Sequence, residues 1–231
     1  MKILVINPGS TSTKIAVYEN DTPRLVRNIR HTVDELSSFS HIIDQFEFRK
    51  NLVLKELEAD NIPFEFDAIV GRGGLLKPIP GGVYEVNDAM LDDILHAMRT
   101  HACNLGCLIA SELAALLPGC RAFIADPGVV DELDEIARIT GSPLMPRITI
   151  WHALNQRAIA RRYAAAQHVR YEDLDLIVCH LGGGISVGVH HHGKAVDVNN
   201  ALDGEGPFSP ERAGTLPAGQ LICLLYTSDA A

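Results

Sequence analysis

The chain has 231 residues, enough for one large domain or two modest ones, and 47% of them are hydrophobic. That composition is typical of an ordinary soluble globular protein and excludes a disordered chain. The net charge is −9, from 20 basic and 29 acidic residues, which argues against a nucleic-acid-binding surface and against a polybasic membrane contact.

No stretch approaches the roughly 20 apolar residues of a membrane span. The N-terminal run Met1–Ile6 stops at Asn7-Pro8-Gly9, so we interpret it as a strand and a turn rather than a signal peptide. The cysteines are odd in number and form no CxxC pair: Cys103, Cys107, Cys120, Cys179 and Cys223. This usage predicts reduced thiols and a cytoplasmic location.

The predicted elements alternate strands with helices, which is an α/β signature. Strands are predicted at residues 3–6, 14–18, 67–70, 121–125, 174–181, 185–190 and 195–198. Helical patterns are predicted at 34–61, from Asn87 to Met98, and at 105–113, 131–139 and 151–166. A Pro/Gly-rich loop is predicted at 77–82 and a domain junction at 143–146.

One unit of the sequence occurs twice. Leu4–Gly9 followed by 12–17 matches Ile177–Gly182 followed by 185–189, each being a strand, a glycine turn and a second strand. The duplication predicts two related domains that face each other across a cleft.

Both turns have the residues of a phosphate-binding loop. Gly9 and Gly182–Gly184 lack a Cβ, so backbone N–H groups can surround an anion, and Ser10–Thr13 and Lys14 add hydroxyls and a charge. A single turn of this kind is more often a plain turn than a phosphate-binding loop, and the occurrence of two in matching contexts makes the two interpretations comparable. Neither is a Walker A loop, and a strand rather than a helix follows each turn, which disfavours a dinucleotide site.

Four polar residues lie at or just past the carboxyl ends of predicted strands, where ligands bind in open α/β sheets: Asn7, Arg72, Asp126 and His180. Glycines flank Arg72, and its guanidinium fork suits a carboxylate or phosphoryl group. Asp126 would either hold Mg²⁺ or cap the turn before Pro127.

Other candidates are less specific. Arg212 lies in an ordered-looking loop at 206–214, and His152 begins a predicted helix, where the dipole favours a neutral imidazole. His190-His191-His192 is interpreted as a solvated hairpin tip rather than a metal site, because consecutive strand residues point to opposite faces.

Several motifs occur in a recognisable order. They are Asn7–Lys14, Val70–Gly74, His101–Gly106, Trp151–Asn155, His180–Gly184, Asp197–Ala201 and Pro210–Gly214. Together they resemble the acetate and butyrate kinase (acetokinase) family, from Met1 to about Gln220. Acetate kinases usually read HRVVHGG at Val70–Gly74 and GNGSS at Gly182–Ser186, so the resemblance is to the butyrate branch, and a branched-chain or other short-chain carboxylate kinase would look nearly the same.

The resemblance implies the duplicated α/β fold of actin, sugar kinases and Hsp70 (ribonuclease H-like), closing over ATP and Mg²⁺. It implies the reversible reaction of ATP with a short-chain carboxylate to give ADP and an acyl phosphate. The full-length protein is expected to be a homo-oligomer. A carboxylate is already ionised at pH 7, so such a site needs donors and cations rather than a general base.

The resemblance also implies roles for individual residues. Arg72 and Arg212 would clamp carboxylate and phosphoryl oxygens, His152 would stabilise the transition state, and Asp126 would organise Mg²⁺ or Arg212. The phosphate-contacting set would be Asn7, Gly9, Ser10, Ser12, Lys14, His180, Gly182, Gly183 and Gly184.

The chain departs from the family at its end. We expect a domain at 1–147 and an incomplete second domain at 148–220, because family members continue further and supply the adenosine pocket and a late acidic residue associated with Mg²⁺. Residues 221–231 are interpreted as a foreign or frame-shifted tail, with a divergent C-terminus as the alternative.

Two other function classes remain open. One is a nucleotide-binding regulator or chaperone-like module of the same fold, which would have no use for a carboxylate clamp at Arg72. The other, less favoured, is a dehydrogenase.

The truncation predicts that the 231-residue chain has little or no kinase activity, since the adenosine pocket would be missing. Acyl-hydroxamate formation from ATP and butyrate by the purified chain measures this. Robust turnover would contradict it.

Overall fold

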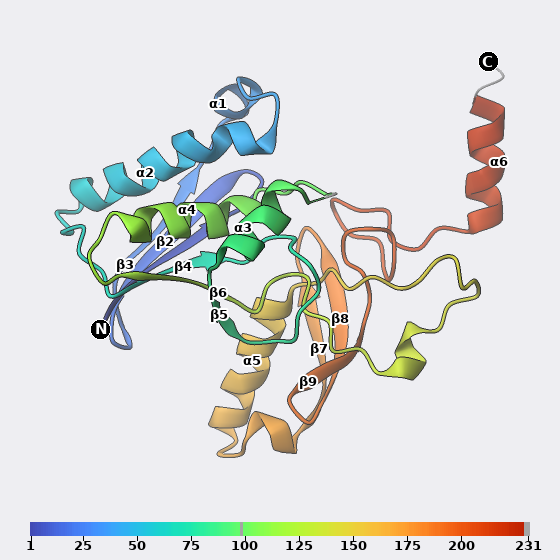
Figure 1. Cartoon of the computed structure of the whole chain (residues 1–231). Helices are drawn as coiled ribbons and strands as arrows, with labels where there is room; N and C mark the ends of the chain where they lie inside the picture. Colours follow the sequence, from blue (N-terminus) through green and yellow to red (C-terminus); the bar gives the residue numbers. More distant parts are fainter. Residues whose placement is uncertain (98, 229–231) are drawn as a thin grey trace. The chain divides into compact units, whose positions relative to one another are not determined.

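A computed structural model describes residues 1–97 and 99–228 (Figure 1). The chain divides into two compact units, the first comprising Met1–Lys77 and Gly81–Val129, the second Pro78–Pro80 and Val130–Ala231. The predicted junction at 143–146 lies inside the second unit. Met98, predicted on a helix face, and the tail residues 229–231 lie outside the described residues.

The first unit is built on a mixed six-stranded sheet in the order β3-β2-β1-β4-β6-β5. The strands are β1 (Lys2–Pro8), β2 (Ser12–Glu19), β3 (Thr22–Arg30), β4 (Ala68–Arg72), β5 (Val83–Glu85) and β6 (Arg121–Ala125). β1, β4 and β6 run parallel, and the remaining pairs are antiparallel. The carboxyl ends of the three parallel strands therefore meet at one edge.

Its helices are α1 (Val33–Ser37), the 3₁₀ turn η1 (Ile42–Gln45), α2 (Phe46–Ala59), α3 (Asp88–Leu95) and α4 (Asn104–Ala115). α2 and α4 cover one face of the sheet (Figure 1). Leu4 pairs with Val17 and Ile6 with Ile15, so these four buried side chains share the face that packs on the two helices. Asn87 caps α3 as predicted, its Oδ1 accepting from the Met90 N–H at 3.0 Å.

Two glycines allow α4 to approach β4 unusually closely. A Cβ on Gly71 would overlap the Gly106 carbonyl, and a Cβ on Gly106 would overlap the Arg72 backbone. Because neither residue has one, the start of α4 lies directly against the end of β4. This contact fixes the loops that precede α4 beside the carboxyl edge of the sheet.

The second unit contains the antiparallel sheet β7 (Asp175–Leu181), β8 (Ile185–His191) and β9 (Lys194–Val198). Its helices are α5 (Ala153–Ala166) and α6 (Ala218–Ser228), with 3₁₀ turns η2 (Glu135–Arg138) and η3 (Tyr171–Asp173). Small residues of α5, Ala160 and Ala164, pack with Tyr171 against β7. β7–β8 and β1–β2 are both antiparallel hairpins with a three-residue glycine-containing connection, as the repeat predicts.

Several predicted elements are wrong or missing. The segment 131–139 is not a helix apart from η2, because its backbone bonds run to other segments: Asp131 N–H to Ile79 O, and Asp134 N–H to Val196 O. Residues 34–61 are largely helical as predicted, but they are divided into α1, η1 and the 14-residue α2. β3 and β5 were not predicted. In the part of the chain that is described, no helix has the length and apolar character needed to cross a membrane.

His190 corrects the interpretation of the histidine run. His191 and His192 are exposed at the hairpin, but His190 is fully buried. Its Nδ1 lies 2.5 Å from Tyr171 Oη and its Nε2 lies 2.9 Å from Gln156 Oε1. Burial, and secondarily the charge of Arg157, lower the pKa of His190 to about 4.

This burial predicts an acid-sensitive second unit. Between pH 6.5 and 4 the unfolded chain binds a proton that folded His190 does not, so the stabilisation is present above pH 6.5 and is lost as pH falls. We expect a loss of about 2–3 kcal/mol from this residue between pH 7.5 and 4.5, measured by urea unfolding.

The His190→Asn variant should be less stable at pH 7.5 but show a smaller loss on acidification. His191→Asn, at the exposed neighbour, serves as the control and should behave like the parent chain. Equal acid losses in the parent and in His190→Asn would contradict the assignment.

Candidate functional site

Asn7 and Arg72 share one face of the sheet at its carboxyl edge. Val5 pairs with Val70 in the parallel β1–β4 ladder, and Asn7 and Arg72 come two residues further along each strand. Lys14 lies opposite Asn7 across β1–β2, so it projects from the same face. This is the face opposite α2 and α4.

Arg72 has an unusual environment for a cation. Its side chain is half-buried, and within the described residues its guanidinium has no hydrogen bond or ion pair. Burial raises the pKa of the Cys103 thiol, and the positive charge of the nearby Arg72 lowers this pKa in part. A half-buried fork without a protein partner can bind a carboxylate or phosphoryl group bidentately.

The predicted phosphate loop forms the tight connection between β1 and β2. The Gly9 N–H donates to the Ser12 carbonyl at 2.7 Å, and Ser10 is exposed at the tip. Ser10 Oγ lies 3.5 Å from Nε2 of His101, whose Nδ1 accepts from the Cys103 N–H. His101 therefore reaches the loop from the segment that precedes α4.

Arg49 of α2 supports this loop from beneath, and sequence reasoning missed it. It is fully buried, and its Nη1 donates to the Ser12 carbonyl at 3.2 Å and to Thr13 Oγ1 at 3.0 Å. Its Nη2 lies 3.5 Å from the Ser10 carbonyl. Holding these carbonyls toward Arg49 directs them away from the ligand side of the loop.

The charge of Arg49 is not neutralised by a carboxylate among the described residues. Nε and Nη2 both donate to Gln45 Oε1, a neutral amide. Burial lowers the pKa of Arg49, yet a guanidinium stays charged in proteins. The loop thus has a buried positive charge behind it, which favours an anion in front. A helix pattern gives no sign of such a role, because most arginines on helices are solvated.

Asp126 lies just past β6 and is buried, with a positive φ of 35°. Its Oδ1 accepts from the Gly82 N–H at 2.9 Å, and its own N–H donates to the Gly82 carbonyl at 2.8 Å. These two bonds connect the residue before β5 to the end of β6. Among the described residues no group of three His, Cys, Asp or Glu is placed to hold a metal ion.

In the second unit the glycine turn supports a set of polar side chains. A Cβ on Gly184 would overlap the Arg212 guanidinium, and a Cβ on Gly183 would meet the Glu211 carboxylate. The Gly183 carbonyl accepts from Ser209 Oγ at 2.6 Å and from the Glu211 N–H at 3.2 Å. The 206–214 loop is thereby anchored over the turn, and glycine is required beneath it.

Two histidines complete this group. The rings of His152 and His180 stack at 3.7 Å between centroids and are 4° from parallel. Asn155 Nδ2 lies 2.9 Å from His180 Nδ1, and Ser186 Oγ lies 2.9 Å from His152 Nδ1. The His152 Cε1 atom is 3.2 Å from the Cβ position of Gly184, beside Arg212. Asn155 and Ser186 were not predicted.

The predicted site residues therefore fall into two sets. The first unit holds Asn7, Gly9, Ser10, Ser12, Lys14, Arg72 and Asp126 at or near one edge of its sheet. The second brings His152, His180, Gly182, Gly183, Gly184 and Arg212 together around one turn. Arg212, like Arg72, has no side-chain hydrogen bond or ion pair within the described residues.

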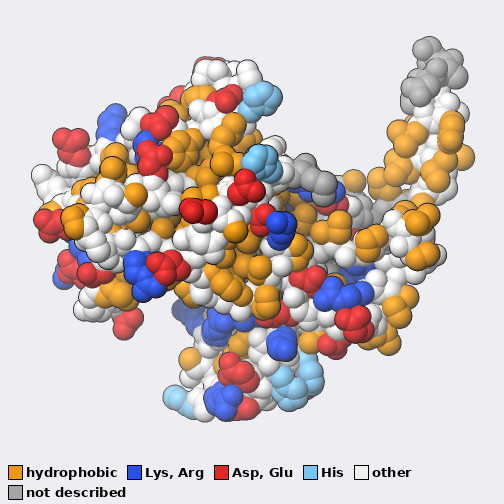
Figure 2. Space-filling view, viewed as in Figure 1, with side chains coloured by type: hydrophobic (Ala, Val, Ile, Leu, Met, Phe, Trp, Pro, Cys, Tyr) orange, Lys and Arg blue, Asp and Glu red, His pale blue; other side chains and the backbone are white. Residues whose placement is uncertain are grey.

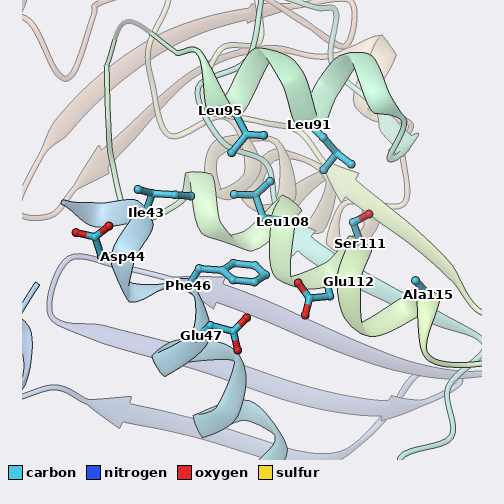
Figure 3. Close-up of a pocket in the computed structure, with 10 residues that line it drawn as sticks. All are labelled: Ile43, Asp44, Phe46, Glu47, Leu91, Leu95, Leu108, Ser111, Glu112 and Ala115. Carbon is cyan, nitrogen blue, oxygen red and sulfur yellow. The ribbon is translucent and has the colours of Figure 1, made fainter.

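An apolar groove of about 530 Å³ lies on the helix side of the first unit (Figure 3). Leu91, Leu95, Leu108 and Phe46 point into it, and Glu47 and Glu112 lie at its rim. None of the predicted site residues lines it. A smaller pocket of about 320 Å³ is lined by Ile42, Ile94, Leu105 and His101, so it adjoins the residue that contacts Ser10.

On the face shown in Figure 2, acidic and basic side chains are interspersed over the first unit. Hydrophobic side chains cover much of α6, where Leu224 and Leu225 are exposed.

Known proteins resemble this chain over 98% of its length. A probable butyrate kinase of Bacteroides thetaiotaomicron is 78% identical over 227 residues, one of Phocaeicola vulgatus is 57% identical, and butyrate kinase 2 of Clostridium acetobutylicum is 54% identical. The chain spans 64% of the length of each. The first alignment covers 227 of 231 residues, so it includes part of 221–231. No family model matches the chain.

Solved structures resemble the fold at low sequence identity. An acetate kinase of Porphyromonas gingivalis has a TM-score of 0.70 at 20% identity, with 99% of this chain and 64% of that one covered. An acetate kinase of Entamoeba histolytica scores 0.69 at 16% identity, covering 98% and 62%. The predicted actin, sugar-kinase and Hsp70 type of fold is confirmed.

The position of Arg49 predicts that anion binding by the first unit depends on a residue outside the site. Arg49→Met removes the charge and the bonds to the loop, and should weaken inorganic phosphate binding about tenfold or more, measured by NMR titration of the loop amides. Arg49→Lys keeps the charge without the fork and should lose less. Arg27→Met, at an exposed arginine paired with Asp60, is the control. Parent-like binding by Arg49→Met would contradict the assignment.

Proposed function

Because the chain belongs to the acetate and butyrate kinase (acetokinase) family over the residues it covers, we propose that the whole protein transfers the γ-phosphoryl group of ATP reversibly to a short-chain carboxylate, with butyrate as the expected acceptor. The acyl phosphate and ADP are the products. A branched-chain or other short-chain acid is the alternative acceptor.

One observation carries this proposal: the two guanidiniums of Arg72 and Arg212. Each is half-buried beside a glycine turn, and neither has a polar side-chain partner within the described residues. A protein keeps cations in this state where a ligand anion completes them. A transfer between two anions, a carboxylate and a phosphoryl group, requires cations that can bind each of them.

The proposed chemistry needs positioning more than acid–base catalysis. Arg72 holds the acceptor carboxylate, one oxygen of which forms the new bond to the γ-phosphorus as the bond to the ADP oxygen breaks. Arg212 and His152 donate hydrogen bonds to the phosphoryl oxygens in the transition state. The Gly9–Ser12 and Gly182–Gly184 turns offer backbone N–H groups to the nucleotide phosphates, with Asn7, Lys14 and His180 beside them.

Asp126 is the residue proposed to hold Mg²⁺, directly or through water. Its carboxylate is buried just past the end of β6, at the ligand edge of the sheet, and its Oδ1 accepts from the Gly82 N–H. Magnesium commonly uses only one or two protein carboxylates together with substrate phosphates, so a single carboxylate from the chain suffices for this role. When bound, Mg²⁺ supplies charge neutralisation for the phosphates.

The domain limits at 1–147 and 148–220, the cytoplasmic location and a homo-oligomeric full-length protein stay predictions. A nucleotide-binding module without transfer chemistry remains the competing function.

Substitution of Arg72, which is proposed to hold the acceptor carboxylate, tests the proposed function. In the protein at its full natural length, Arg72→Ala should lower kcat/KM for butyrate at least about 100-fold, because two charge-assisted bonds of about 1.5–3 kcal/mol each are lost. Arg72→Lys should recover only part of this. Acyl-hydroxamate formation, profiled from acetate to isobutyrate, is the measurement. Arg24→Ala, at an exposed arginine paired with Glu19, is the control.

Binding of ATP without phosphorylation of any of these acids would contradict the proposed kinase activity. If the parent protein binds ATP but phosphorylates none of these acids, and Arg72→Ala leaves ATP binding unchanged, the nucleotide-binding module is correct.

A further inference from the structure

A buried chain of hydrogen bonds ends on the ring of His152. It starts at Tyr171 and passes through His190 to Gln156, whose Nε2 lies 2.8 Å from Ser186 Oγ. Ser186 Oγ in turn lies 2.9 Å from His152 Nδ1. His190, Gln156 and Ser186 are fully buried, so no water competes for these bonds.

The orientation of the Gln156 amide follows from one contact. Its Nε2 lies 3.0 Å from the Ser186 carbonyl, which can only accept a hydrogen bond. The NH₂ group therefore faces Ser186, and Oε1 faces His190 Nε2, which must donate. Burial lowers the pKa of His190 and keeps it neutral, so its Nδ1 accepts from the Tyr171 hydroxyl.

Among the described residues that contact it, the Ser186 hydroxyl has a single hydrogen-bond acceptor. Oγ is approached by two groups that only donate, Gln156 Nε2 at 2.8 Å and the His152 backbone N–H at 3.4 Å. Among its contacts in the described residues, only His152 Nδ1 can accept. The buried O–H therefore donates to Nδ1, because leaving it unbonded would cost free energy.

We propose that Gln156 and Ser186 are positioning residues that hold His152 as a neutral imidazole carrying its proton on Nε2. Protonation would place a second proton on Nδ1 and leave the Ser186 hydroxyl without an acceptor. The site thereby obtains a hydrogen-bond donor without another positive charge. Its use on a phosphoryl oxygen rests on the proposed function, but the protonation state does not.

Three neighbours of His152 act in the same direction. His152 is the N-cap of α5, where the helix dipole disfavours a cation. From β7, His180 stacks on its ring, and from the 206–214 loop Arg212 lies over Gly184 beside its Cε1 atom. Glu211 over Gly183 is the one nearby carboxylate of that loop and acts in the opposite direction.

The experiment is NMR of the ¹⁵N-histidine-labelled 231-residue chain, with His152→Gln used to assign the signals. We expect Nδ1 of His152 to be unprotonated, Nε2 to be protonated, and the ring to stay neutral well below pH 6.5. In Ser186→Ala the pKa of His152 should rise by about one unit, a tenfold change in its protonation equilibrium. Ser186→Thr keeps the hydroxyl and should restore the parent titration.

Two outcomes would overturn the proposal: a proton on Nδ1 of His152 in the parent chain, or an unchanged titration in Ser186→Ala. The first needs no variant, so a variant that fails to fold leaves the proposal testable. In the full-length protein, Ser186→Ala should move the acid limb of the kcat profile to higher pH with KM for the carboxylate unchanged. Absence of any kinase activity would reject the proposed function while leaving the NMR result standing.

Discussion

The close contact between Gly71 and Gly106 is the constraint on which the first unit's ligand edge depends. Where a helix must start against the end of a strand, side chains on either backbone would push the two apart. With glycine on both sides, α4 begins beside Arg72 and Pro8, and a Cβ on Gly106 would come within 3.2 Å of Pro8 Cδ. The Leu75 N–H then finds its acceptor in Asn104 Oδ1, which fixes the loop after Arg72 to the same helix.

Charge in this acidic chain is concentrated locally. With a net charge of −9 the protein as a whole repels anions. A phosphate or carboxylate site therefore needs guanidiniums whose positive charge is not neutralised by carboxylates of the protein. Arg49 achieves this by burial on neutral acceptors, and Arg72 and Arg212 by partial burial beside glycines. An exposed arginine such as Arg24, paired with Glu19, contributes little to such a field because solvent and its partner screen it.

The sequence predicted the parts of the fold that depend on local pattern. The hairpins at Gly9 and Gly182–Gly184, the β6 strand at 121–125 and the Asn87 cap follow from strand alternation, glycine turns and capping chemistry. The acidic segment 131–139 failed because its backbone partners lie on Ile79 and Val196, far away in the chain. β3 was missed because its exposed, charged residues are typical of a loop. It is a strand because its backbone pairs with that of β2.

Site residues at strand ends could be predicted because topology brings such positions together. Arg49 and Ser186 could not, since each acts on a site residue from beneath and has no motif of its own. Gln156 and His190 likewise read as ordinary helix and strand residues. Their importance appears only when each buried donor and acceptor is matched to a partner.

The two units handle cationic groups in different ways, and the difference has a physical reason. Around the first turn an additional charge is tolerated because Arg49 is bonded to carbonyls and lies behind the backbone. Around the second turn, Arg212 already lies over Gly184, and His152 and His180 stack face to face. A second and third cation there would repel one another at close range. The Ser186 hydroxyl donates to His152 Nδ1, which keeps that ring neutral and leaves Nε2–H as a donor. The second unit thereby has a directional hydrogen-bond donor without an additional positive charge.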